Sequence, residues 1–93
     1  MIAGILRETG GDLRVALLPG ETVSLIKLGL KVMVENDAGE GAFASDDQYR
    51  AAGATAEPRS EVIRAADILL TVNPPLVDDI NQFREGQMIF TVL

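Results

Sequence analysis

The sequence contains no cysteine, no histidine and no tryptophan. Without cysteine there is no disulfide framework and no thiolate nucleophile. Without cysteine and histidine there is no Cys/His zinc site, and without histidine there is no histidine general base. Only two lysines occur among eight basic residues, against fourteen acidic ones, and the formal net charge is −6. Because no basic stripe is present, neither nucleic acid nor an anionic membrane surface is an expected partner.

Long apolar stretches are also missing. No run approaches the roughly 18–20 apolar residues that span a bilayer, so direct membrane insertion is not expected. The opening segment MIAGILRE is typical of a first strand rather than of a signal peptide. The remaining composition, 47% hydrophobic and 24% charged over 93 residues, indicates one small globular domain. A cytoplasmic location fits the absence of cysteine.

Four apolar runs predict strands that are covered on both faces, because nearly every residue in them is apolar. These strands are expected at residues 2–6, 30–35, 67–72 and 88–92, with a short fifth strand at 54–56. Helical spacing predicts helices at 19–28, 45–52, 60–66 and 76–83. Pro19 suits a first helical position, Ser45 and Ser60 suit N-caps, and Gly29 and Gly53 suit left-handed stops.

This alternation predicts an α/β fold, namely a small three-layer Rossmann-like or flavodoxin-like domain with a parallel sheet of four to five strands. Each crossover is expected to be right-handed. In such sheets ligands bind beyond the carboxyl ends of the strands. The loops at 7–18, 36–44 and 73–75 are therefore the candidate functional segments. Because the sequence ends inside the apolar run 88–93, we expect a truncated domain.

Arg14 is the candidate binding residue of the first loop. Its guanidinium suits bidentate binding of a substrate carboxylate. The alternative is that Arg14 braces its own loop against Asp12 or Glu8, as most loop charges do. Asn73, after the third long strand, has two similar interpretations. Its amide either binds a ligand placed over the sheet or satisfies local backbone groups in a turn.

The loop at residues 39–44 matches the dinucleotide pattern G-x-G-x-x-A. The match is weak, because the fingerprint requires a tight turn from strand to helix and the predicted helix begins only at Ser45. An ordinary glycine-rich loop is the preferred interpretation. The adjacent pairs Asp46–Asp47 and Asp78–Asp79 are explained as helix-start charges rather than as acid–base pairs.

A series of motifs, in order over nearly the whole chain, carries a family resemblance. They are Arg7-Glu8, Asp12-x-Arg14-Val15-Ala16-x-x-Pro19, Leu28-Gly29, Val32-x-Val34-Glu35, Ala38-Gly39, Asp47-x-Tyr49, Ala52-Gly53-Ala54 and the run Ala66-Asp67-Ile68-Leu69-Leu70-Thr71-Val72-Asn73-Pro74-Pro75. With this set, residues 1–93 resemble the N-terminal domain of the family of alanine dehydrogenases and NAD(P) transhydrogenase alpha subunits.

The resemblance implies a two-domain subunit whose NAD(H) cleft lies between the domains. The family's NAD fingerprint would lie in a second domain beyond residue 93, so no cofactor is expected on this fragment alone. NADP(H) would be carried by a partner domain. The resemblance also implies a homodimer that associates with membrane and NADP-binding subunits at the cytoplasmic face of the inner membrane.

The two branches of the family differ at positions that can be checked. Alanine dehydrogenases have K-V-K-E-P where this chain has Thr71-Val72-Asn73-Pro74-Pro75, and their second lysine holds the substrate together with the arginine matched by Arg14. Transhydrogenase alpha subunits typically have K-V-N, so Asn73 fits that branch, whereas Thr71 departs from both. The resemblance thus implies a part in hydride transfer between NADH and NADP⁺.

Under that reading Arg14, Thr71 and Asn73 are cleft-lining candidates, and no catalytic residue or metal ligand is expected. Hydride chemistry belongs to the nicotinamides, so the protein's task is positioning. Two alternatives stay open. One is an alanine dehydrogenase-type oxidoreductase, and the other is a non-catalytic module of the same fold.

Overall fold

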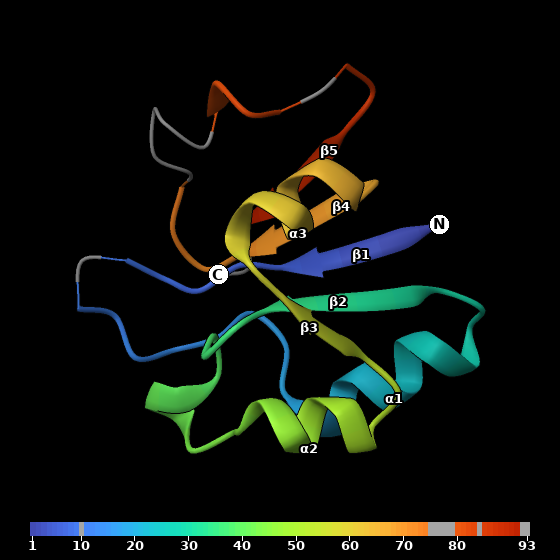
Figure 1. Ribbon diagram of the computed structural model, residues 1–93, viewed down its shortest axis with the longest axis vertical. Helices are drawn as coiled ribbons and strands as arrows, with labels where there is room; N and C mark the ends of the chain where they lie inside the picture. Colours follow the sequence, from blue (N-terminus) through green and yellow to red (C-terminus); the bar gives the residue numbers. More distant parts are fainter. Residues whose placement is uncertain (10, 75–79, 84, 92–93) are drawn as a thin grey trace.

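The computed structural model describes residues 1–9, 11–74, 80–83 and 85–91 and contains one five-stranded parallel sheet (Figure 1). Its strands are β1 (Ile2–Ile5), β2 (Lys31–Glu35), β3 (Thr55–Glu57), β4 (Ile68–Thr71) and β5 (Met88–Thr91). The helices of the described chain are α1 (Pro19–Lys27), α2 (Asp46–Ala51), α3 (Arg59–Ala65) and the 3₁₀ turn η1 (Glu40–Ala42). The predicted α/β fold and the fifth strand are confirmed.

The strand order is β3-β2-β1-β4-β5, with every pairing parallel. The chain first moves outward from β1 through β2 to β3 and then returns to the other side of β1 for β4 and β5. This is the strand order of Rossmann domains and not the flavodoxin-like order, which decides between the two predicted topologies. The direction in which successive strands are added to the sheet reverses between β1 and β4. Ligands of such sheets bind at this switch point.

Helices cover both faces of the sheet (Figure 1). On one face α1 and α2 pack over a buried cluster of Ile5, Val32, Val34, Ala38, Ala44, Tyr49 and Ala54. On the other face α3 packs over Leu6, Val62, Ile63, Ala66 and Leu69. Successive residues of a strand point to opposite faces, which places Ile5 in the first cluster and Leu6 in the second. The core is aliphatic apart from Tyr49, as the scarcity of aromatics predicts.

Gly4 allows α3 to lie close to the central strand. A Cβ atom at this position would come within 2.8 Å of the Ala66 Cβ and of the Val62 Cγ1. Real Cβ atoms do not tolerate such contacts, so any larger residue would push α3 away from the sheet. The glycine is therefore needed for packing and not for an unusual backbone conformation.

The predicted starts of two helices are confirmed and the third is wrong. In α1, Pro19 occupies the first position and the Glu21 carboxylate accepts a hydrogen bond from the Leu18 N–H at 2.9 Å. In α2, the Ser45 hydroxyl accepts from the Gln48 N–H at 3.2 Å. Ser60 is not a cap, because the Pro58 carbonyl already accepts the N–H groups that begin α3. Proline's fixed φ and missing N–H suit that start.

The strand limits differ from prediction by about one residue. The fifth strand was expected at 54–56 and lies at Thr55–Glu57, since the left-handed Gly53 and its hydrogen-bonded turn shift its start. The helix predicted at 76–83 falls largely on residues outside the described ones. Among the described residues 80–83, Ile80 is helical, residues 81–82 form a turn and Phe83 has no regular structure.

β5 lies at the edge of the sheet and is more exposed than the other strands. Its residues Met88, Ile89 and Phe90 are 47%, 38% and 52% exposed. Within the described part of the chain β4 is its sheet neighbour. No helix described in this chain is long and apolar enough to cross a membrane.

Replacing Gly4 by Ala is expected to lower the free energy of unfolding by about 1–3 kcal/mol, because the added methyl overpacks the contact with α3. Gly20 provides the matched control, since it lies in α1 and a Cβ there would meet no atom within 4 Å. Gly20→Ala should be neutral or stabilise by up to about 1 kcal/mol. Urea denaturation of both variants measures the difference, and equal effects would contradict the packing role of Gly4.

Tyr49 is the only tyrosine, and its buried hydroxyl donates a 2.6 Å hydrogen bond to the Leu17 carbonyl. Burial, followed by the carboxylates of Glu21 and Asp46, raises the pKa of Tyr49 to about 12. The folded state then binds this proton more tightly than the unfolded state, whose pKa is near 10.0. The contribution of the protonated Tyr49 hydroxyl to the free energy of unfolding is therefore fully present below pH 10. It is lost as the pH rises from about 10 to 12.

Absorbance of the phenolate at alkaline pH measures this titration directly. The folded protein should titrate well above the urea-unfolded protein. A folded midpoint equal to the unfolded one would show that the hydroxyl reaches solvent.

Candidate functional site

The loops that follow β1 and β4 meet at the switch point of the sheet. Asn73 lies just beyond β4, and its backbone N–H donates to the Glu8 Oε1 at 2.7 Å. The Asn73 side-chain amide donates to the same oxygen at 3.2 Å and to the Asp12 Oδ2 at 2.8 Å. One amide thus joins two carboxylates from the loop after β1. We call Glu8, Asp12, Arg14 and Asn73 the polar cluster.

Arg14 and Asp12 form a bidentate ion pair within this cluster. The guanidinium Nε lies 3.0 Å from the Asp12 Oδ1, and NH2 lies 2.7 Å from Oδ2. The Arg14 backbone N–H also donates to the Asp12 Oδ1 at 2.9 Å. The predicted brace of Arg14 against Asp12 is therefore the interaction that forms. The guanidinium is committed to a partner inside its own loop.

The hydrogen bonds determine which groups of the cluster are ionised and which atoms remain to accept a hydrogen bond from another molecule. Bonds from the Arg14 side chain, then from its backbone N–H and from Asn73, hold the pKa of Asp12 well below its usual range. With Glu8 included, the cluster contains two carboxylates and one guanidinium. Since both amide hydrogens of Asn73 point to carboxylates, the oxygen is the amide atom left to accept from elsewhere. The cluster suits hydrogen-bond donors better than anions.

Two buried oxygen atoms, one in the cluster and one at the end of β4, have no hydrogen-bond partner within the described residues. They are the Glu8 Oε2 and the Thr71 Oγ1, and both are buried. Glu8 is 9% exposed and Thr71 is 3% exposed. A buried polar group without a partner costs about 1–3 kcal/mol, so a donor that reaches these atoms would be stabilised.

A second network lies beside the polar cluster at the same edge of the sheet. The Arg59 guanidinium, at the start of α3, lies 2.6 Å from the Glu35 Oε1 at the end of β2. It also donates to the Arg7 carbonyl at 3.0 Å, and the Arg7 N–H donates to Glu35 at 3.0 Å. This network ties the ends of β1 and β2 to α3. Its charges are paired, which indicates a structural role.

The three predicted cleft-lining residues differ in their contacts and burial. Arg14 braces its loop against Asp12 and not against Glu8. The Asn73 amide donates to the carboxylates of another loop and not to local backbone groups, and its role towards a ligand stays a prediction. Thr71 is the last residue of β4 and is buried in the described structure. Arg14 and Asn73 do come together, through their shared partner Asp12.

Glu8 has a larger part in the site than the sequence indicates. The sequence suggests it only as a possible partner of Arg14, yet it accepts two hydrogen bonds from Asn73. A signal was present in the sequence. A carboxylate placed directly after a buried parallel strand lies at the ligand-binding edge of the sheet.

The glycine-rich loop at 39–44 is not a dinucleotide fingerprint. Gly39 precedes the 3₁₀ turn η1, and α2 begins only at Asp46. A Cβ on Gly39 would lie 2.6 Å from the Ala44 carbonyl oxygen and 2.8 Å from the Tyr49 ring. Close packing therefore explains this glycine, and the loop lacks the tight turn from strand to helix that the fingerprint requires.

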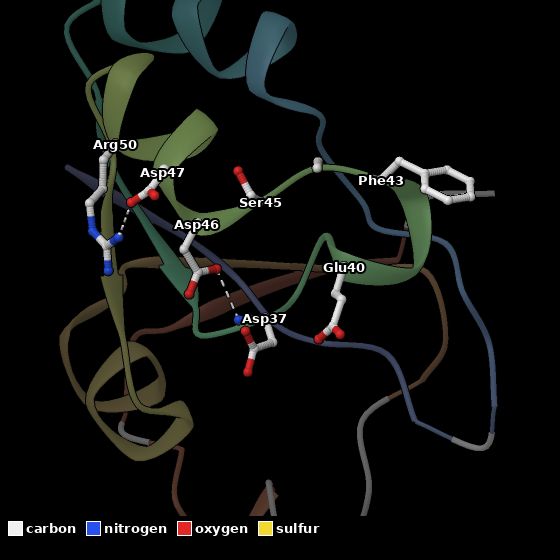
Figure 2. A pocket seen from close by; sticks show the side chains of 8 residues that line it. Asp37, Glu40, Phe43, Ser45, Asp46, Asp47 and Arg50 are labelled. Carbon is white, nitrogen blue, oxygen red and sulfur yellow. Dashed lines mark hydrogen bonds and ion pairs between the residues drawn. The ribbon is translucent and has the colours of Figure 1, made fainter.

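A surface hollow of about 460 Å³ adjoins this loop (Figure 2). Its lining residues are Asp37, Glu40, Phe43, Ala44, Ser45, Asp46, Asp47 and Arg50. Arg50 pairs with Asp47 at 2.8 Å, and the Asp46 Oδ1 accepts from the Asp37 N–H at 2.9 Å. The hollow is strongly acidic and therefore unsuited to phosphate groups. In the part of the chain that is described, no group of three or more acidic side chains is arranged to hold a metal ion.

Together the strand order and the edge chemistry define a Rossmann-like α/β domain with a polar cluster at its switch point. The family model described as "Alanine dehydrogenase/PNT, N-terminal domain" matches residues 4–93. The chain belongs to this family, whose characterised relatives are oxidoreductases.

Both branches occur among the similar proteins. The alanine dehydrogenase of Mycobacterium tuberculosis is 36% identical over 95 aligned residues, covering 100% of this chain and 26% of that protein. The alanine dehydrogenase of Methanococcus maripaludis is 35% identical with the same coverage. The crystal structure of transhydrogenase from Sinorhizobium meliloti superposes with a TM-score of 0.94 at 30% identity, covering 100% of this chain and 28% of that one.

An L-alanine dehydrogenase structure superposes with a TM-score of 0.86 at 27% identity over 98% of this chain and 26% of that one. This chain therefore spans about a quarter of the length of its relatives. The fold is shared across both branches, so the choice between them depends on the residues of the site.

Removing the guanidinium fork should raise the pKa of Asp12. In the folded protein, Asp12 stays ionised below the ordinary aspartate pKa of 3.8. Its stabilising contribution is present above that pH and is lost as the pH falls through the lowered value. Carboxyl carbon NMR shifts, recorded down to the lowest pH at which the protein stays folded, measure this titration. Arg14→Gln should move the midpoint upward, towards 3.8, because the first and largest cause of the lowered pKa is lost.

Glu61 gives an internal comparison in the same NMR spectra, since Arg64, whose hydrogen bond lowers the pKa of Glu61, is untouched by the substitution. An Asp12 midpoint that is unchanged in Arg14→Gln would show that the ion pair does not form in solution.

Proposed function

We propose that this domain forms one wall of the NAD(H) cleft in the alpha subunit of a proton-translocating NAD(P) transhydrogenase. The complete enzyme transfers hydride between NADH and NADP⁺. In this proposal a second domain of the longer protein contributes the dinucleotide fingerprint, and NADP(H) is carried by a separate component. The subunit is a homodimer at the cytoplasmic face of the membrane that holds the proton-translocating segments.

The observation that carries the proposal is the pairing of Arg14 with Asp12 beside Asn73. An enzyme that binds a 2-oxo acid needs unpaired positive charge to hold the substrate carboxylate. Here the guanidinium is neutralised within its loop, Asn73 is uncharged, and Glu8 adds a further negative charge. This arrangement disfavours a small carboxylate substrate. It is compatible with a cleft in which the nicotinamide is the reacting group.

The residues also fit a positioning role for the nicotinamide coenzyme. When bound, the coenzyme supplies the hydride chemistry. The Asn73 amide oxygen and the Glu8 carboxylate are acceptors, which suits hydrogen-bond donors such as the carboxamide N–H₂ of a nicotinamide. The domain needs no histidine or cysteine base for this task, and the chain contains neither.

An alanine dehydrogenase-type oxidoreductase is the second candidate function. It is favoured by sequence identities of 34–36% to curated alanine dehydrogenases. The amino-acid substrate of that reaction would have to bind without the second lysine, which is Asn73 here, and beside a paired Arg14. The two candidates therefore predict opposite results with pyruvate.

Two assays on the full-length protein distinguish them. In membranes that contain the partner component, NADH should reduce NADP⁺ or a thionicotinamide analogue of it. Amination of pyruvate with NADH and ammonium should stay within about tenfold of the rate without enzyme, with an authentic alanine dehydrogenase as positive control. Robust pyruvate turnover without transhydrogenation would replace the first candidate by the second.

A further inference from the structure

The two carboxylates of the polar cluster fix the direction of the Asn73 amide. Its Nδ2 lies 3.2 Å from the Glu8 Oε1 and 2.8 Å from the Asp12 Oδ2. A carboxylate oxygen accepts hydrogen bonds and has none to donate, so a reversed amide would bring its own oxygen against two other acceptors. The Asn73 Oδ1 is therefore directed away from both carboxylates, and it accepts no hydrogen bond within the described residues.

Glu8 adds a negative charge that no ion pair offsets in the described part of the chain. Its Oε1 accepts both bonds from Asn73, whereas its Oε2 is buried and has no partner. The Arg14 guanidinium is paired with Asp12 instead. Because Glu8 is only 9% exposed, water and salt screen its charge poorly. The switch point thus combines a directed acceptor oxygen with a weakly screened negative charge.

We propose that this combination selects the amide form of the pyridine coenzyme and rejects the form whose ring carries a carboxylate. The inference rests on the proposed function, in which the nicotinamide lies beside the polar cluster. The carboxamide of NAD(H) has an N–H₂ group that donates to the Asn73 Oδ1. A nicotinic acid dinucleotide has a carboxylate in its place, which has no hydrogen to donate and is repelled by Glu8.

The two kinds of residue in this selection have different tasks. Asn73 contacts the ring substituent and determines the specificity. Glu8 and Asp12 are positioning residues, because they act through the direction of the Asn73 amide, and Glu8 also contributes the repulsion. Discrimination is strong when the wrong ligand leaves an acceptor without a donor and meets a like charge as well.

The test measures the Kd of the full-length subunit for three oxidised dinucleotides by calorimetric titration. They are NAD⁺, its thionicotinamide analogue, which keeps the N–H₂ group, and nicotinic acid adenine dinucleotide. The thionicotinamide form should bind within about threefold of NAD⁺. The nicotinic acid form should bind at least about thirtyfold more weakly, since it loses the hydrogen bond and meets the charge of Glu8.

Glu8→Gln removes the charge but keeps an oxygen that accepts from Asn73. It should lower the ratio of the Kd for the nicotinic acid form to the Kd for NAD⁺ at least fivefold, with the Kd for NAD⁺ within about threefold of the unmodified protein. A merely structural effect would change both Kd values alike and leave their ratio constant. Asp47→Asn is the matched control, because it changes the net charge equally at a side chain that is 91% exposed outside the polar cluster.

Asn73→Ala removes the acceptor and leaves the charge in place. Glu8 still accepts from the backbone N–H of residue 73, a bond of 2.7 Å that the substitution does not touch. The Kd for NAD⁺ should rise about three- to tenfold, because the carboxamide loses one hydrogen bond. The Kd for the nicotinic acid form should stay the same. Melting temperatures report the stability of each variant, and the two ligands are compared on the same folded protein.

The outcomes separate this inference from the proposed function. If the complete enzyme transfers no hydride from NADH to NADP⁺, the proposed function fails and the inference fails with it. If transfer occurs and the unmodified subunit binds both dinucleotides equally, the inference alone is wrong. It is also wrong if the subunit discriminates but Glu8→Gln keeps the same ratio as Asp47→Asn, since the selection would then lie outside the polar cluster.

Discussion

The double hydrogen bond from the Asn73 amide to Glu8 and Asp12 is the contact on which the candidate site depends. It joins the loop after β1 to the end of β4 across the switch point of the sheet. Because both carboxylates accept from the same amide, the amide orientation, the Arg14 ion pair and the sign of the local charge are set together. A lysine in place of Asn73 would change the charge of the site. It would bring positive charge to the two carboxylates and leave Arg14 freer to bind an anion.

The sequence predicted the fold well, because the signals for it are local. Apolar runs separated by helical spacing gave the strands and helices, and Pro19, Ser45, Gly29 and Gly53 marked boundaries that the structure confirms. Ser60 failed as a cap, since a proline two residues earlier begins the helix. The strand order was left open between two topologies, because the return from β3 to the far side of β1 is a property of long-range packing.

The candidate site was predicted less completely for a related reason. Loop positions beyond strand ends indicated Arg14 and Asn73, but which groups they contact depends on residues 61 positions or more apart, such as Asp12 and Asn73. No local pattern shows that Asn73 donates to two carboxylates, or that the Thr71 side chain is buried. The family resemblance predicts the branch from single residues such as Asn73, whereas the ion pair between Arg14 and Asp12 becomes visible only in the folded loop.

The exposure of β5 has a consequence for how the domain behaves in solution. Parallel sheets of this kind are normally covered on both faces, yet Met88, Ile89 and Phe90 each present apolar area to solvent at an edge of the sheet. An apolar edge strand is a template that extends a sheet by recruiting any compatible extended segment. In these 93 residues β5 is therefore the place where an added extended segment would meet unpaired backbone groups and lengthen the sheet.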